Sequence, residues 1–292
     1  MSKLKSLASR AVTGAVYVGI ILGCILTNQM VLMAWVLALF AMLGSYEYQL
    51  MTRANLYALF LRIFHSLMAG VPIYVAYTLV DYSGDWRRTL MAALPYFCYL
   101  LFYLIGETYR LKRQPSIELG HAFFAHLYTA LPLGLLVLTM GARYGVAEQL
   151  GGDFAFPDTF WLLPIMVTIW LNDTGAYLFG SLLGRHKLFE RVSPNKSWEG
   201  AIGGGVVAIL GAIGFHALFP EVATLGNWIV LAVMIVFFGN FGDLFESFLK
   251  RAYGVKDSGY ILPGHGGILD RIDSLLFVAI PSFFYINLVI LA

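Results

Sequence analysis

The sequence predicts an all-α integral membrane protein, a single polytopic bundle of about nine transmembrane helices. Of its 292 residues, 59% are hydrophobic and only 12% are charged, about half the charged fraction of a soluble domain. The mean hydropathy is +0.75. The apolar residues form runs of about 20, the length at which an α-helix crosses a bilayer. The formal net charge of +2 gives no basis for nucleic-acid binding.

Nine stretches are long and apolar enough to be spans, with short polar segments between them. The first follows Lys3, Lys5 and Arg10 without a clear small-x-small cleavage site, so we interpret it as an uncleaved helix. The third is the weakest, because Arg62 and His65 lie near its start. The expected spans are 11–28, 31–49, 59–80, 89–107, 118–141, 158–183, 200–219, 226–249 and 274–291.

The basic residues predict the orientation of these spans. With the N-terminus inside, most lysines and arginines fall on the cytoplasmic side, and only Arg87, Arg88 and Arg143 fall clearly on the far side. Cytoplasmic loops carry an excess of basic residues, so we expect N-in/C-out. A missed or false pair of spans would not change this orientation. The compact size and short loops suit a bacterial cytoplasmic membrane.

We expect one membrane domain over 1–292. Within it, 1–150 would form scaffold spans with dimer or lipid contacts, and 151–292 would form the catalytic spans. This division follows the charges, because the densest set lies between the last two spans, where 247–274 reads SFLKRAYGVKDSGYILPGHGGILDRIDS. Charge is costly near lipid and usually marks function. The stretch would face the cytoplasm, where nucleotides are dissolved.

Two acids lie near the end of the eighth span. Asp243, Glu246 and Lys250 are spaced i, i+3 and i+7, so they share one helix face. The helix dipole disfavours negative charge near a C-terminal end, so both acids need a positive partner. Lys250 can neutralise Glu246 as an i,i+4 pair. Asp243 would still need a partner, which a bound cation would supply.

Asp270 precedes the ninth span and can lie beside Asp243 if the glycine-rich loop folds back. Two aspartates from neighbouring helix ends suit Mg²⁺, which binds a few carboxylates together with water and phosphate oxygens. Asp273 lies three residues further on. It could join this site, cap the last helix or pair with Arg271.

Glycines and cations around these acids suit phosphate groups. Gly266 and Gly267 would let backbone amides approach an anion closely. His265 could donate to phosphate or hold the loop, and without His or Cys partners nearby it does not indicate zinc. Acids for a metal and cations for phosphates indicate phosphoryl or nucleotidyl transfer. The candidate phosphate-binding cations are Lys250, Arg251, Lys256 and Arg271.

Two polar segments upstream fall on the same predicted side. Asp173 lies beside Asn172 inside an apolar span; a hydrogen bond to a neighbouring helix is the structural alternative to a functional role. Ser193, Lys196 and Ser197 precede the seventh span, where the free amides of a helix start attract anions. An ordinary basic loop with a serine cap is the alternative there.

The run from Ser247 to Asp273, S-x-L-K-R-x(4)-K-D-x-G-x(2)-L-P-x-H-G-G-I-x-D-R-I-D, resembles the signature of phosphatidate cytidylyltransferases, also called CDP-diacylglycerol synthases. The segments D-T-x-A-Y-x-x-G at 173–180 and S-P-x-K-[ST]-x-E-G at 193–200 resemble that family too. Asn195 and Ser197 stand where relatives often carry another small or basic residue and a threonine. The resemblance is specific over about 170–275; before that it rests on hydropathy and length.

The resemblance implies a magnesium-dependent membrane enzyme, often a homodimer, that condenses CTP with phosphatidic acid to CDP-diacylglycerol and pyrophosphate in phospholipid biosynthesis. It implies Asp243 and Asp270 as metal ligands, Lys250 as a catalytic cation and Asp173 as an essential polar group of the cavity. A second, monovalent cation stays open. The expected substrate contacts are Ser193, Lys196, Ser197, Glu246, Arg251, Lys256, Asp257, His265, Gly266, Gly267, Arg271 and Asp273.

Two other readings remain. A CTP-dependent lipid kinase, of the kind that acts on polyprenol or phytol, would move the γ-phosphoryl group to an alcohol and release CDP instead of pyrophosphate. A transporter with charged gating residues would show related halves and broken helices near the midplane. The charges here gather in the C-terminal half at one predicted surface, which counts against a transporter. No GxxxxGK[ST] run is present, so a P-loop is not supported.

Overall fold

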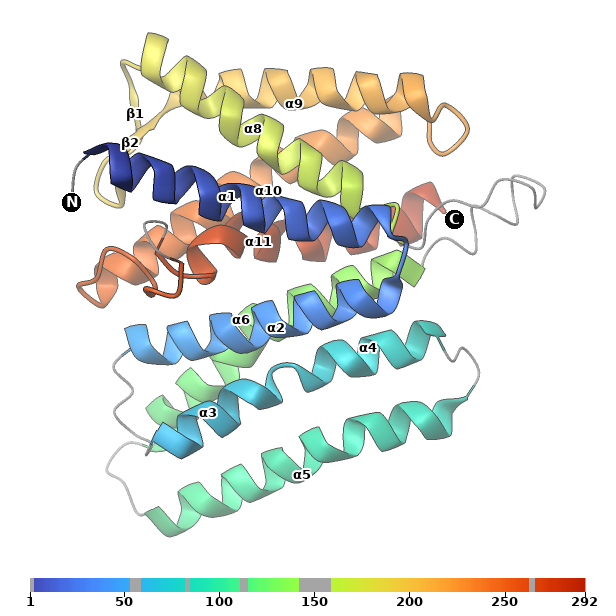
Figure 1. Ribbon diagram of the computed structural model, residues 1–292, viewed down its shortest axis with the longest axis vertical. Coiled ribbons are helices and arrows are strands. Elements are labelled where there is room, and N and C mark those ends of the chain that lie inside the picture. Colours follow the sequence, from blue (N-terminus) through green and yellow to red (C-terminus); the bar gives the residue numbers. More distant parts are fainter. Residues whose placement is uncertain are drawn as a thin grey trace. The chain divides into compact units, whose positions relative to one another are not determined.

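The computed structural model describes residues 3–52, 59–81, 85–110, 115–141, 159–262 and 266–291. Nearly all the elements in these residues are helices (Figure 1), as the sequence predicts. The N-terminal helices are α1 (Lys3–Leu26), α2 (Met30–Met51), α3 (Leu59–Met68), α4 (Val71–Asp81), α5 (Trp86–Arg110) and α6 (Pro115–Gly141). The remaining elements are α8 (Leu162–Leu183), β1 (Lys187–Phe189), β2 (Ser193–Ser197), α9 (Trp198–Leu218), α10 (Leu225–Ala252), α11 (Leu269–Tyr285) and a π-helical turn, η1 (Ile286–Ile290).

Eight helical segments of the described chain are long and apolar enough to cross a membrane, and they confirm a polytopic helical membrane protein. They coincide with the second to ninth expected spans. The first expected span falls on α1, whose described apolar part is Gly14–Leu26. The third is broken into α3 and α4, because Pro72 in the first turn of α4 has no N–H to continue the helical hydrogen bonds.

The chain divides into two compact units that do not follow chain order. The first unit comprises Met1–Gly141 and Asp257–Ile272, and the second comprises Ala142–Lys256 and Asp273–Ala292. Most of the glycine-rich signature therefore folds with the N-terminal helices, although more than a hundred residues of chain separate them. This division decides which candidate site residues each unit holds.

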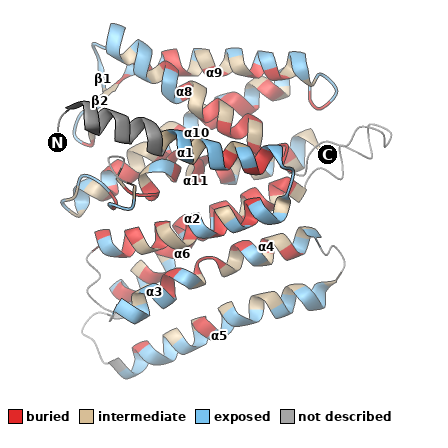
Figure 2. Cartoon of the chain, viewed as in Figure 1, coloured by how far each residue is buried: buried red, intermediate tan, exposed pale blue. Residues whose placement is uncertain are grey.

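In the first unit, α2 and α4 pack on α6, and α5 packs on α4. Leu133, Leu136 and Met140 of α6 are completely buried. In α6, 67% of the apolar membrane-spanning stretch is buried, whereas in α5 only 6% is. Most of α5 is therefore drawn in the exposed colour (Figure 2). A helix that is apolar yet so little covered suits contact with lipid or another chain.

In the second unit, glycines set the close approach of α8 and α9. A Cβ added at Gly175 would lie 2.9 Å from Gly204 Cα, and one added at Gly204 would lie 2.5 Å from the carbonyl oxygen of Asn172. Small residues let helix backbones approach closely in membrane proteins. From sequence alone, the glycines at 203–205 indicate a close helix approach but not whether it lies within one chain or between two. At Gly204 the approach lies within the chain.

A short hairpin connects α8 and α9, where the sequence predicts only a loop. β1 and β2 are antiparallel, with Lys187 opposite Ser197 and Phe189 opposite Ser193. Strands of three and five residues are too short for the alternating pattern that predicts strands. The hairpin fixes the direction in which Lys196 points, and this matters for the site.

Candidate active site

Asp243 meets Lys196 in the second unit. The Nζ atom of Lys196 lies 2.6 Å from Oδ2 of Asp243, and the two side chains keep 24% and 39% of their surface exposed. The hydroxyl of Ser247 donates to the other oxygen, Oδ1, at 3.3 Å. Lys196 is thus the positive partner that Asp243 needs on α10, and it comes from the hairpin, not from its own helix.

Lys250 pairs with Glu246 on the next turns of α10. Its Nζ atom donates to Oε2 of Glu246 at 2.8 Å, and the exposed fractions are 11% for the lysine and 1% for the glutamate. This is the i,i+4 pair that the spacing predicts. Burial of both partners makes the pair far less screened by solvent than a surface ion pair.

Asp273 brings a further carboxylate to this place. At Gly242, an added Cβ would lie 2.5 Å from the carbonyl oxygen of Asp273. The backbones of α10 and α11 are therefore in close contact at the residue that precedes Asp243. The carboxylate of Asp273 interacts electrostatically with Asp243, Asp173 and Lys250. We call Asp173, Asp243 and Asp273 the carboxylate cluster; Lys196 and Lys250 are its two lysines.

Asp173 lies in the middle of α8 and is exposed. The side-chain amide of Asn172 donates to its Oδ1 at 3.4 Å, a bond within the same helix. The side chain of Asn172 is buried, and its own oxygen has no hydrogen-bond partner among the described residues. An exposed acid within an apolar span needs water or ligand around it, and it therefore marks a polar opening in this unit.

The donor set of the cluster fits a magnesium ion that also binds substrate. Among the residues that the structure describes, no three His, Cys, Asp or Glu side chains converge into a ready-made metal site. Magnesium usually takes one or two carboxylates and completes its shell with water and phosphate oxygens. The like charges of the carboxylate cluster repel one another, and a divalent cation would relieve this repulsion.

The segment before α9 is organised as a helix cap. The amide of Gly200 donates to Oγ of Ser197 at 3.2 Å, so Ser197 caps the N-terminus of α9. This is the structural role that the sequence offers as the alternative to anion binding. The carboxylate of Glu199 accepts from the amides of Arg185 and His186. Ser193 opens β2 opposite Phe189. Of the candidates here, Lys196 is the one that reaches the carboxylate cluster.

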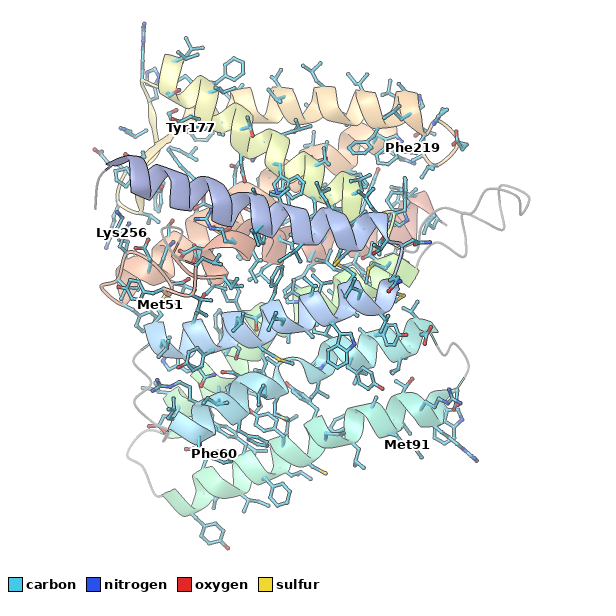
Figure 3. The ribbon with its side chains drawn as sticks, viewed as in Figure 1. Met51, Phe60, Met91, Tyr177, Phe219 and Lys256 are labelled. Carbon is cyan, nitrogen blue, oxygen red and sulfur yellow. The ribbon has the colours of Figure 1, made fainter. Side chains whose placement is uncertain are left out.

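The chain after α10 presents its cations at the surface. Arg251 is exposed, and its Nη1 donates to the carbonyl oxygen of Val255 at 3.0 Å. Lys256, labelled in Figure 3, is exposed as well. Gly254 has φ +69°, a conformation that favours glycine, and it reverses the chain between these two cations.

Asp270 organises the signature loop in the first unit. Its Oδ2 accepts from the amide of Ser258 at 3.0 Å, from the hydroxyl of Ser258 at 2.9 Å and from the amide of Gly267 at 2.8 Å. Gly266 has φ +82°, and an added Cβ there would lie 2.5 Å from the same oxygen. The anion that Gly266 and Gly267 approach is therefore the carboxylate of Asp270.

The other predicted residues of this loop are placed as follows. Asp257 and Arg271 are exposed. The hydroxyl of Tyr17, from α1, donates to the carbonyl oxygen of Arg271 at 3.2 Å. His265 lies outside the described residues. Asp243 and Asp270, the expected metal ligands, belong to different units; that they share one ion is a proposal.

Glu47 is a residue that the sequence analysis did not identify. It lies in α2 and has no exposed surface. Its carboxylate accepts from the amides of Ile268 and Leu269 at 3.0 and 2.8 Å. A single acid in the otherwise apolar 31–49 span is a signal that could have found it, but its neighbours in sequence give no hint of the partner.

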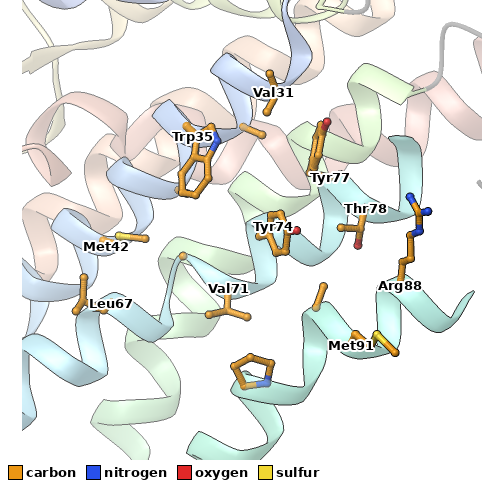
Figure 4. Close-up of a pocket in the computed structure, with 15 residues that line it drawn as sticks. Val31, Trp35, Met42, Leu67, Val71, Tyr74, Tyr77, Thr78, Arg88 and Met91 are labelled. Atoms are coloured by element: carbon orange, nitrogen blue, oxygen red, sulfur yellow. The ribbon is translucent and has the colours of Figure 1, made fainter. Parts of the chain in front are cut away.

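Two apolar hollows accompany these polar groups. A groove of about 430 Å³ between α9 and α10 is lined by Trp198, Ile202, Val236, Phe237, Phe241 and Leu244. Phe241 and Leu244 flank Asp243 along the chain. A cavity of about 560 Å³ in the first unit, between α2, α4 and α5, is lined by Trp35, Leu67, Tyr74, Tyr77, Arg88 and Met91 among others (Figure 4). The groove adjoins the cluster in sequence, whereas the cavity contains no acid that could react.

The family model that matches this chain and two of its relatives carry the name of cytidylyltransferases. The model of a family described as "Cytidylyltransferase family" matches residues 8–289. Proteins named phosphatidate cytidylyltransferase are similar to one part of the chain: that of Staphylococcus haemolyticus is 51% identical over 120 residues, and that of Staphylococcus aureus strain COL is 49% identical over 120 residues. Each alignment covers 40% of this chain and 45% of the relative's length.

Proposed function

This chain belongs to the Cytidylyltransferase family, and from that premise we propose that it condenses CTP with phosphatidic acid, forming CDP-diacylglycerol and pyrophosphate. The names of the relatives support these substrates. The observation that carries the proposal is the carboxylate cluster, with Lys196 and Lys250 beside it, in a unit that also holds an apolar groove. A substrate with acyl chains and a phosphate needs both surfaces.

The reaction asks little of a general base. The phosphate of phosphatidic acid is already an anion at neutral pH, and one of its oxygens attacks the α-phosphorus of CTP. The bond from the α-phosphorus to the bridging oxygen breaks, and pyrophosphate leaves with that electron pair. Catalysis of this kind depends on positioning and on neutralising charge. Lys196 and Lys250, the two lysines of the carboxylate cluster, would be the cations that neutralise this charge.

Asp243 and Asp270 would hold a magnesium ion, with Asp273 contributing from the turn of α11 beside Asp243. When bound, magnesium would offset the charge on the phosphate oxygens of CTP. Lys196 would then exchange part of its contact with Asp243 for a substrate phosphate. Asp173 would keep the opening on α8 polar. A second, monovalent cation remains open.

The other expected contacts stay part of the proposal. Cations around the carboxylate cluster would bind the triphosphate, because ionised donors make short, strong bonds to phosphate. Gly266 and Gly267 would act by letting the loop close around Asp270. The residues assigned to substrate contact are Ser193, Ser197, Glu246, Arg251, Lys256, Asp257, His265, Arg271 and Asp273.

We also propose where the protein works. The distribution of basic residues supports an N-terminus and an active site on the cytoplasmic side of the inner membrane, in the N-in/C-out orientation. CTP would then arrive from the cytoplasm, and phosphatidic acid from the bilayer. Residues 151–292 would supply most of the reacting groups and 1–150 the scaffold, with the little-covered helix α5 suited to a homodimer contact.

The test is an assay with purified protein, phosphatidic acid in mixed micelles and CTP labelled in the cytosine base, with and without Mg²⁺. We expect label in CDP-diacylglycerol, release of pyrophosphate in equal amount and no product without the metal. Release of CDP and phosphorylation of an added polyprenol would instead identify a lipid kinase. No turnover of either kind, in protein that remains folded, would contradict the proposal.

A further inference from the structure

The loop that carries Asp270 is held by a carboxylate from the first half of the chain. Glu47 of α2 is separated by 221 positions from Ile268 and by 222 from Leu269, whose amides donate to its two oxygens. The hydroxyl of Ser258 lies 3.2 Å from Oε2 of the same side chain. All these residues belong to the first unit, so the contact is part of one compact body.

The place that Glu47 occupies is the start of α11. The first amides of a helix have no partner within the helix, and the helix dipole favours negative charge there. The two backbone amides that bond to Glu47 are donors, and an ionised carboxylate is an acceptor only. Glu47 thus caps α11 from another helix, through the amides of the two residues that precede Asp270.

Two glycines of the signature make room for this carboxylate. An added Cβ at Gly259 would lie 2.5 Å from Oε1 of Glu47, and one at Gly267 would lie 2.3 Å from Oε2. No side chain fits at such distances unless Glu47 moves. The glycine positions of the loop are therefore shaped by Glu47 as well as by Asp270.

Ser258 connects the two carboxylates. Its hydroxyl lies within hydrogen-bond distance of Oε2 of Glu47 and Oδ2 of Asp270, and since a hydroxyl has one hydrogen, it donates to one of them at a time. Its amide donates to Asp270. The orientation of Asp270 therefore depends on a loop that Glu47 also holds.

We infer that Glu47 is a positioning residue, which fixes the signature loop and the first turn of α11 so that Asp270 is oriented for metal and nucleotide. The role in catalysis rests on the proposed function; the role in holding the loop does not. Glu47 has no exposed surface, so it would act through Asp270. Loss of a group that orients a metal ligand commonly costs about 10- to 100-fold in metal affinity or activity.

The test compares Glu47→Gln with Gln49→Leu in purified full-length protein. Gln49 lies on the same helix, is 3% exposed and donates to Ser66 of α3, away from the loop; it is the control for loss of a buried polar group in α2. Two quantities are measured: amide hydrogen exchange of peptides within 258–270, and the Mg²⁺ dependence of turnover.

In Glu47→Gln, a side-chain NH₂ group replaces one of the two oxygens that accept hydrogen bonds from backbone amides, so a donor faces a donor. We expect faster exchange in 258–270 and an Mg²⁺ requirement raised about 10- to 100-fold, with both quantities unchanged in Gln49→Leu. Glu47→Asp, which keeps the charge, should recover part of the effect. Wild-type exchange and Mg²⁺ dependence in Glu47→Gln, or equal changes in the control, would overturn the inference.

Gly259→Ala tests the same contact from the loop side, including the case in which Glu47→Gln does not fold, because the three atoms nearest its added Cβ all belong to Glu47. It should reproduce the exchange and Mg²⁺ effects, and the double variant should be less impaired than the product of the two single effects. Independent effects would count against the inference. If wild-type protein forms no CDP-diacylglycerol, the proposed function fails, but the exchange measurements still decide the role of Glu47.

Discussion

The charge of Asp243 is central to the proposed metal site, but its ion pair contributes little to the stability of the fold. Its partner Lys196 and Asp243 itself are 24% and 39% exposed, and ion pairs this accessible contribute about 0–1 kcal/mol to folding. Glu246 and Lys250, with 1% and 11% exposed, form the pair that the fold depends on, because removing one buried partner leaves the other charge uncompensated.

Asp243→Asn and Asp270→Asn should therefore each abolish Mg²⁺-dependent turnover while the protein still folds and inserts. Turnover is measured as CDP-diacylglycerol formed, and folding as the thermal unfolding midpoint in detergent. Glu221→Gln, which changes an exposed acid in the turn after α9, is the control and should behave as wild type. Retained turnover in either aspartate variant would remove that residue from the proposed metal site.

Among the elements, α8 and α9 pack closely together, and their contact depends on glycine. Gly204 leaves no room for a methyl group, whereas Gly214 on the same helix has nothing within 4 Å of an added Cβ. These two positions separate the effect of crowding from the effect of helix propensity. An alanine in open space should stabilise the helix by about 0.5–1 kcal/mol relative to glycine.

Gly204→Ala should destabilise the protein by about 1–3 kcal/mol, the usual cost of forcing extra volume into a tight contact. Gly214→Ala should be neutral or slightly stabilising. The free energy of unfolding in mixed micelles, titrated with a denaturing detergent, measures both. Equal stability of the two variants would mean that α8 and α9 can separate at Gly204 without cost.

For the whole molecule, the charge distribution predicts which parts of the chain face the cytoplasm. In a variant lacking Cys24 and Cys98, cysteines are placed at Arg87, in the first turn of α5, and at Lys187, in β1. A membrane-impermeant maleimide should label the cysteine at 87 in intact spheroplasts and the one at 187 only after permeabilisation. The reverse pattern would contradict the N-in/C-out orientation and place the cluster away from CTP.

Local features of the fold and the site were predictable because their causes lie close together in sequence. Runs of about 20 apolar residues predict spans, and eight of the nine coincide with helices long enough to cross a membrane. The Glu246–Lys250 pair follows from i,i+4 spacing alone. The hairpin was not predictable because its strands are too short to show a period. The break between α3 and α4 was not predictable because Pro72 lies within an apolar run long enough to predict one unbroken span.

The sequence by itself determined that this protein is a bundle of membrane helices with a charged signature near its C-terminal end, because hydrophobic periodicity and residue spacing act over one helix at a time. Only the tertiary structure decided that Lys196 pairs with Asp243, that Asp273 joins Asp243 and Asp173, and that Glu47 holds the loop of Asp270. These contacts join residues tens to hundreds of positions apart. No local pattern encodes such partners; they follow from which buried charge finds its donors when the helices pack.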